Sequence, residues 1–238
     1  MTTSVTENTT ITISAAAARA RDLGVLLLAM VSGATDAIGF VALGGVFTSV
    51  MTGNMVFFGL AIARGDVGQL ANAATAIVCF MLGCAIGARI AGRPAKNDPP
   101  WPRPVTVALL LEFGLFGAYT IGYESAHLGH ANATLQPILL ALTATGLGVQ
   151  SAAVQRFGQS GLSTTYMTGT LTTLVARLAT GGSARDAMPN LRLLLGLIAG
   201  AVAGGLLAVY ARPFAPVLQL GLLAGVLVIA SLPRERHG

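Results

Sequence analysis

Six long apolar segments constrain this chain more than any other feature of its sequence. They cover residues 23–63, 70–90, 105–123, 135–154, 191–210 and 216–232. A membrane-spanning helix needs roughly twenty apolar residues, and the first segment has about twice that length. Only 10% of the residues are charged, against roughly 25% in a soluble domain. The sequence therefore predicts an all-α polytopic membrane protein, much of whose surface is covered by lipid.

The distribution of Lys and Arg predicts how the segments cross the membrane. The chain carries a net charge of +5, and the segment 89–103 holds three Arg and one Lys, whereas the segment 124–132 holds none. Three crossings in each half of the chain put nearly all basic loops in the cytoplasm, whereas four crossings move the most basic loop outside. We therefore expect six transmembrane helices and two cytoplasmic termini.

The sequence contains no basic stripe with interleaved aromatic residues, so nucleic-acid binding is not expected.

The chain divides into a polar tail and two similar halves. Residues 1–22 are expected to form a mobile cytoplasmic tail, residues 23–126 a first membrane repeat and residues 127–238 a second. The triplet MTG at 51–53 recurs at 167–169, and GxxxG at 83–87 resembles GxxxG at 196–200. Because three crossings is an odd number, the second repeat would enter from the opposite side of the membrane. The sequence thus predicts inverted-topology repeats, a plan common in secondary transporters.

Each repeat contains a polar motif that is unusual for an apolar segment, namely VFTSVMTGNMV at 46–56 and LSTTYMTGTLT at 162–172. We expect each motif to form a broken or re-entrant element, since Gly permits a turn and Thr or Asn can cap a helix. A helix N-terminus at membrane depth could attract an anionic or polar solute. The motif side chains could instead only satisfy the backbone around a break.

Polar residues within the apolar segments are the candidates for a substrate or ion pathway. They are Asp36, Thr48, Ser49, Thr52, Gly53, Asn54, Glu112, Gln150, Ser151, Thr164, Thr165, Thr168, Gly169 and Thr170. A charge at mid-membrane costs at least about 2.5 kcal/mol, so such a residue usually faces the protein interior or a water-filled path. Asp36 and Glu112 could relay protons, or each could be a structural carboxyl group. Gln150 could line a site or make an ordinary hydrogen bond between helices.

Signatures of enzymes, metals and cofactors are missing from the sequence. The patterns HExxH, GxSxG, GxxxxGK[ST] and GxGxxG after a strand do not occur. Cys79 and Cys84 are not spaced as CxxC, and His127 and His130 have no evident third metal ligand. We therefore predict a protein that is not an enzyme and that has no cofactor and no metal site.

Three stretches resemble a known family. SGATDAIGFVALGGVFTSVMTGNMVFFG, GVQSAAVQRFG and STTYMTGTLTTL are similar to the YoaK family of small bacterial inner-membrane proteins, which have a domain of unknown function. The resemblance covers nearly the whole chain after the tail, although Gln150-Ser151 stands where members often have Gln-Asn. It implies a six-helix protein of the bacterial cytoplasmic membrane and supplies no substrate.

The site residues lead to two functional hypotheses. The first is a small permease or secondary transporter for a polar or anionic solute bound between the two motifs, with Asp36 and Glu112 coupling transport to protons. The second is a structural or regulatory membrane protein without transport. A channel would need a continuous polar stripe, and the polar residues cluster instead. The sequence leaves the oligomeric state open.

Overall fold

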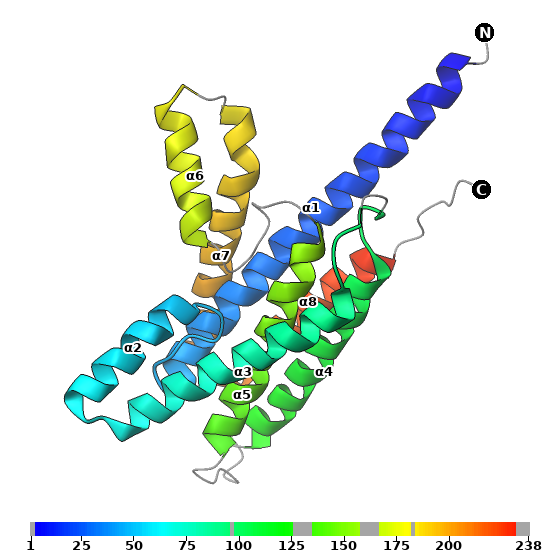
Figure 1. Ribbon diagram of the computed structural model, residues 1–238. Coiled ribbons are helices and arrows are strands. Elements are labelled where there is room, and N and C mark those ends of the chain that lie inside the picture. The colour runs from blue at the N-terminus through cyan, green and yellow to red at the C-terminus, as the bar shows by residue number, and fades with distance from the viewer. Residues whose placement is uncertain (1–2, 96–97, 126–134, 158–166, 182–183, 232–238) are drawn as a thin grey trace.

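The protein is a bundle of α-helices (Figure 1). The computed structural model describes residues 3–95, 98–125, 135–157, 167–181 and 184–231. The elements are α1 Thr3–Ala42, α2 Met51–Arg64, α3 Val67–Ala91, α4 Arg103–Ser125, α5 Leu135–Val154, η2 Gln155–Phe157, α6 Met167–Ala179, α7 Ala184–Tyr210, η3 Arg212–Phe214 and α8 Ala215–Ser231. The predicted boundary between the two halves lies outside the described residues.

Six of the described helices are long and apolar enough to cross a membrane, which confirms the number predicted from the sequence. They belong to α1, α3, α4, α5, α7 and α8. The other two, α2 and α6, have 14 and 13 residues. At 1.5 Å per residue, each is about 20 Å long, short of the roughly 30 Å hydrocarbon core of a bilayer.

The first apolar run, 23–63, is broken in the middle. Helix α1 ends at Ala42 and α2 begins at Met51. Gly44 and Gly45, with φ values of 102° and 69°, allow the chain to turn between them. At its other end α1 begins at Thr3, so the segment expected to be a mobile tail continues the first helix.

Helices α1 and α5 form the centre of the bundle. Of their apolar stretches, 61% and 67% are buried, against 22–33% in the other four spans. Helix α1 packs mainly against α7 and α8, whereas α5 packs mainly against α3 and α4. Each central helix is therefore covered chiefly by two spans that belong to the other half of the chain.

Glycines bring the backbones of two helix pairs into contact. A side chain at any of these glycines would strike the backbone of the partner helix. The contacts of α3 with α5 are Gly83–Thr145, Gly87–Val149 and Gly148–Phe80, and those of α7 with α1 are Gly200–Met30, Gly204–Ala34 and Gly33–Leu197. From Gly83–Thr145 to Gly87–Val149, and from Gly200–Met30 to Gly204–Ala34, the residue number rises by four in both helices, so the two helices of each pair run parallel.

These contacts correct the alignment of the two halves. Each residue of α3 in such a contact has its counterpart 117 residues later in α7, and each residue of α5 has its counterpart 115 residues earlier in α1. The counterpart of the pattern at 83–87 is therefore Gly200 and Gly204, and not the pattern at 196–200. Gly196 lies one helical turn earlier, against Leu26.

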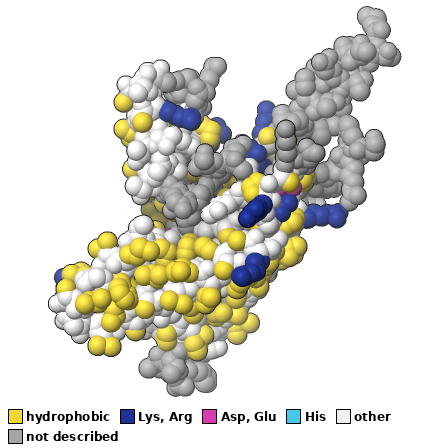
Figure 2. All heavy atoms as spheres, viewed as in Figure 1, with side chains coloured by type: hydrophobic (Ala, Val, Ile, Leu, Met, Phe, Trp, Pro, Cys, Tyr) yellow, Lys and Arg dark blue, Asp and Glu magenta, His cyan; other side chains and the backbone are white. Residues whose placement is uncertain are grey.

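The outward faces of the helices are apolar, as contact with lipid requires. Met81 of α3 and Ile121 of α4 are 63% and 72% exposed. Figure 2 shows hydrophobic side chains spread over the face formed by α2, α3 and α4, with Lys and Arg mostly near one end of the bundle. A band of apolar surface next to basic ends is typical of a protein that spans a membrane.

Candidate functional site

Asp36 lies near the end of α1, where the carboxylate binds the chain that turns back from this helix. Its Oδ1 accepts hydrogen bonds from the backbone N–H groups of Thr48 and Ser49, both at 2.7 Å, and from the Thr48 hydroxyl at 3.0 Å. Its Oδ2 accepts the Ser49 hydroxyl at 2.5 Å. All three residues are buried. The carboxylate therefore satisfies four donors that would otherwise lack a partner in the protein interior.

A second set of hydrogen bonds closes the same loop. The Asn54 amide accepts the Phe47 N–H at 2.9 Å and donates to the Phe47 carbonyl oxygen at 2.6 Å. The Phe47 ring stacks on those of Phe40 and Phe57, with centroids 5.3 Å and 5.8 Å away. A side chain at Gly53 would lie only 3.1 Å from the Phe47 ring. The loop thus accounts for the polar residues Thr48, Ser49 and Asn54 of this motif and for its Gly53.

This loop bears directly on the predicted anion site. Helix α2 begins at Met51 after its N-cap Val50, and the carboxylate of Asp36 accepts the N–H groups of Thr48 and Ser49 in the turn just before it. Negative charge is stabilising at a helix N-terminus, where the N–H groups have no partner within the helix. The protein's own carboxylate therefore lies in the turn that leads into α2, where its negative charge would oppose the binding of an anionic solute.

Gln150 joins the two central helices. Its amide nitrogen donates to the Ser32 hydroxyl at 2.9 Å and to the Leu28 carbonyl oxygen at 3.2 Å, so α5 is bonded to α1 inside the bundle. Gln150 is fully buried, and its neighbour Ser151 is 3% exposed. Ser32 did not emerge from the sequence, since a single Ser in an apolar helix gives no signal about its partner.

The residues of the two motifs do not form one cluster in the described part of the chain. Thr52 is exposed on α2, and Thr168 and Gly169 are exposed on α6, whereas Thr170 is buried. Helix α2 packs against α3 and α6 packs against α7, and Figure 1 draws α2 and α6 well apart. Thr164 and Thr165, like His127 and His130, lie outside the described residues.

Glu112 is fully buried in the middle of α4. Among the described residues, neither of its carboxyl oxygens has a hydrogen-bond partner. Its Cγ lies 3.5 Å from where a side chain of Gly146 on α5 would begin. No hydrogen bond joins Glu112 to Asp36, whose acceptor oxygens are taken by Thr48 and Ser49.

Two further features were not predicted from the sequence. Gln219 of α8 is fully buried, and neither its amide oxygen nor its nitrogen has a partner within the described ranges. Its signal was the likeness of VLQLGLLAG at 217–225 to LLEFGLFGA at 110–118, which aligns Gln219 with Glu112. In the same described ranges, no cluster of three His, Cys, Asp or Glu side chains could hold a metal ion.

The other feature is an ion pair at the end of the bundle where α3 and α5 end. Arg156 donates from Nε and Nη2 to the two oxygens of Asp98, both at 3.0 Å, and also bonds the Ala91 carbonyl oxygen at the end of α3. The hydrogen bond from Arg156, and then that from the Ala95 N–H, holds the pKa of the Asp98 carboxyl below its ordinary value. A bidentate pair of this kind orients as well as attracts, so it ties the loop after α3 to the end of α5.

Comparisons with known proteins agree with this architecture. The family model described as "Protein of unknown function (DUF1275)" matches residues 24–230. The UPF0700 transmembrane protein YoaK of Bacillus subtilis (strain 168) is 37% identical over 160 residues, which are 67% of this chain and 68% of that protein. No solved structure matches. The resemblance drawn from the sequence is thereby confirmed, and the chain belongs to the YoaK family of multi-pass transmembrane proteins, which carry the DUF1275 domain of unknown function.

Proposed function

We propose that this protein is a small secondary transporter of the bacterial cytoplasmic membrane, built from two inverted three-helix repeats. The observation that carries the proposal is the reciprocal packing of the halves. The first span of each half lies against the second span of the other half, through glycine contacts at equivalent positions. Inverted repeats are common in secondary transporters, whose substrate sites lie where the repeats meet.

Polar side chains buried between the halves support a solute site there. Gln150 of the second half binds Ser32 and the Leu28 carbonyl oxygen of the first. Groups of this kind are costly inside a membrane, where they usually mark a pathway or a binding site. A polar uncharged solute fits better than an anionic one, because the carboxylate of Asp36 lies in the turn that leads into α2.

The basic ends support the proposed orientation. Arg89, Arg103 and Arg156 lie at or near the ends of α3, α4 and α5 that meet at the Asp98 ion pair. Under the positive-inside rule this end is cytoplasmic, with both termini on the same side. The short helices α2 and α6 would then enter the membrane and return to the side from which they came. No enzymatic step is part of the proposal.

One observation favours the alternative, a structural or regulatory membrane protein. Every hydrogen bond of Asp36 and Asn54 goes to the loop around them, so the first motif is satisfied without a solute. In that case the motif only stabilises the break between α1 and α2.

Exchange of solute across a membrane separates the two functions. Proteoliposomes that contain the purified protein would be loaded with unlabelled sugars, polyols, amino acids, nucleosides or monocarboxylates. Uptake of the matching radiolabelled compound from outside would then be followed. A transporter exchanges at least one class, and Gln150→Leu reduces that exchange while the protein elutes normally from gel filtration. Thr120→Val serves as the matched control, because the Thr120 hydroxyl bonds only within α4. Folded and correctly oriented protein that exchanges no class would support the structural alternative.

A further inference from the structure

The loop between α3 and α4 carries two side chains that bind the second half of the chain. Asp98 pairs with Arg156, whose Nε and Nη2 each donate to a carboxylate oxygen at 3.0 Å. Trp101 packs its ring against that of Phe157, with the ring centroids 5.2 Å apart. Arg156 and Phe157 directly follow α5 and belong to the second half, whereas Asp98 and Trp101 belong to the first. This loop therefore joins the two halves at the end of the bundle where α3 and α5 end.

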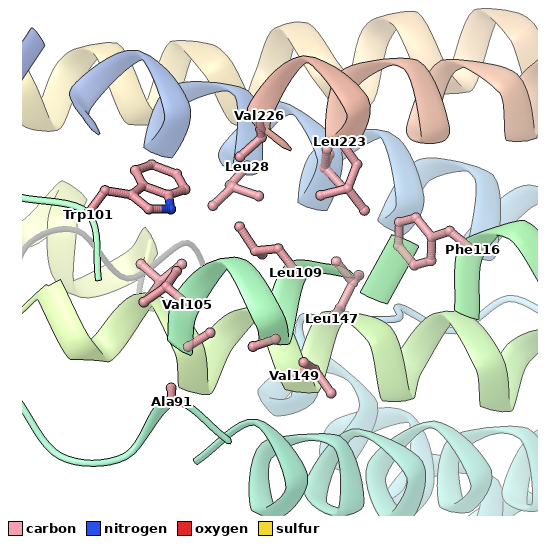
Figure 3. Packing of buried hydrophobic residues seen from close by; sticks show 14 residues of the cluster. Leu28, Ala91, Trp101, Val105, Leu109, Phe116, Leu147, Val149, Leu223 and Val226 are labelled. Carbon is pink, nitrogen blue, oxygen red and sulfur yellow. The ribbon is translucent and has the colours of Figure 1, made fainter. Parts of the chain in front are cut away.

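Trp101 covers the core of the bundle at this end. It is only 2% exposed, and it belongs to the same buried cluster as Leu28 and Val105. Its indole N–H donates to the Thr106 hydroxyl of α4 at 3.0 Å, and a side chain at Gly24 of α1 would strike its ring. Figure 3 shows Trp101 at one end of the cluster. The indole thus lies against α1 and α4 as well as the ring that follows α5, and it shields the core between them.

The polar groups shared by the two halves lie deeper along the same face of α1. Gly24, Leu28 and Ser32 follow one another at intervals of four residues, so they share a face of this helix. The Leu28 carbonyl oxygen and the Ser32 hydroxyl both accept from the Gln150 amide. The eight residues from Gly24 to Ser32 correspond to about 12 Å along the helix. Trp101 therefore stands between this end of the bundle and the site proposed for a solute.

The contacts that hold this loop are of a kind that can open and close. The side chains of Arg156 and Asp98 keep 15% and 19% of their exposure, so water can replace the hydrogen bonds of the ion pair when it separates. The loop leaves α3 through Gly92, whose φ of 68° is easily reached by glycine. Loop residues of this kind absorb the backbone rotation when a segment moves. The glycine contacts within the bundle, in contrast, join helix backbones directly and leave no such freedom.

We infer that Asp98 and Trp101 form a gate, which the ion pair with Arg156 holds closed over the polar groups between the halves. The inference rests on the proposed function, because a site between two repeats of a transporter opens to each side of the membrane in turn. Opening separates the ion pair and withdraws the indole from α1, so that water and solute reach Leu28. The structure is then the state in which this end of the bundle is closed.

Reaction of a cysteine placed beneath the gate tests the inference. Leu28→Cys would be made in a chain whose Cys79 and Cys84 are replaced by alanine, and the protein in lipid nanodiscs would be treated with a small cationic methanethiosulfonate. Mass spectrometry then gives the rate of labelling. With the ion pair intact, labelling should be slow but measurable. Arg156→Gln or Asp98→Asn should raise the rate about tenfold or more, because each removes hydrogen bonds between charged groups that hold the closed state.

Two controls separate opening of the gate from loss of charge and from unfolding. Arg89→Gln removes an exposed arginine from the last turn of α3 and should leave the rate unchanged. Leu140→Cys, fully buried near the start of α5, should label slowly with or without the ion pair. The only tryptophan of the chain is Trp101, so its fluorescence serves as a second measurement that needs no cysteine. Arg156→Gln should shift the emission to longer wavelength and increase quenching by iodide.

Three results would overturn the inference. One is an equal rate of labelling at position 28 with and without the ion pair, and another is no labelling at all while the ion pair is intact. The third is an effect of Arg156→Gln that Asp98→Asn does not share, which would assign Arg156 to the Ala91 carbonyl oxygen alone. None of these measurements needs a solute. Faster labelling without exchange of any solute would retain the moving gate and refute the transporter, whereas exchange with unchanged labelling would do the reverse.

Discussion

Replacing Asp36 tests whether one carboxylate builds the break between α1 and α2. Asp36→Ala removes the acceptor for the N–H groups of Thr48 and Ser49 and for both of their hydroxyls. The hydroxyls can rotate toward other acceptors, but the two backbone N–H groups cannot. At about 1–3 kcal/mol for each buried donor left unsatisfied, the expected loss in the free energy of unfolding is about 2–6 kcal/mol.

Asp36→Asn is the conservative variant in this series. Its amide oxygen can still accept the two N–H groups, and the Ser49 hydroxyl can turn to accept from the amide nitrogen. Only the additional strength of hydrogen bonds to a charged acceptor is lost, so the expected cost is about 1–2 kcal/mol. Thr35→Ala is the matched control, because its hydroxyl donates only to the Val31 carbonyl oxygen one turn earlier in α1.

Stability can be measured by titrating purified protein from mild detergent into SDS while following the single tryptophan. Hydrogen exchange at the amides of Thr48 and Ser49 reports the loop itself. We expect the order of loss Asp36→Ala, then Asp36→Asn, then Thr35→Ala, with faster exchange at both amides in the alanine variant. If Asp36→Ala is as stable as Thr35→Ala and exchange is unchanged, Asp36 does not hold the loop.

Three further predictions follow from the contacts described above. Gly83→Ala should destabilise the protein by about 1–3 kcal/mol, because the alanine side chain would meet the backbone of α5. Gly114→Ala should not destabilise it, because a side chain there would have nothing within 4 Å. Equal stabilities of the two variants in the SDS titration would contradict the close contact. Asn54→Leu should release the Phe47 backbone and cost about 1–3 kcal/mol, which increased exchange at the Phe47 amide would report. The depressed pKa of Asp98 contributes stability above its ordinary value of 3.8, and that stability is lost as the pH falls through the lower folded value. Asp98→Asn should therefore be less stable than the wild type at neutral pH, with the difference vanishing in acid, and a difference independent of pH would argue against the pair with Arg156.

The number of spans and the location of the break could be predicted from the sequence. Each span follows from the length of an apolar segment, because the cost of placing a residue in lipid adds along the helix. The first run was about twice the length of a span and held a polar motif, so a break within it was predictable. Its geometry was not predictable, since the pairing of Asp36 with Thr48 and Ser49 depends on a loop twelve residues away.

The alignment of the halves could not be chosen from sequence alone. Gly196, Gly200 and Gly204 recur every four residues, so the pattern at 83–87 matches either adjacent pair. Backbone contacts with α1 select Gly200 and Gly204. Likewise, Thr52 and Asn54 share a motif, but one is exposed and the other fully buried, because a helix turns them to different faces.

The membrane-spanning character of this chain, its six apolar helices and its family could all be recognised from the amino-acid sequence. Those properties depend on composition and order along the chain, which the sequence contains completely. Which polar groups have hydrogen-bond partners became visible only in the folded structure. It pairs Asp36 and Gln150 with neighbours and leaves Glu112 and Gln219 without one in the described residues. A hydrogen bond needs its donor and acceptor about 3 Å apart. That distance is set by the packing of helices that lie far apart in the sequence, so no single segment reveals it.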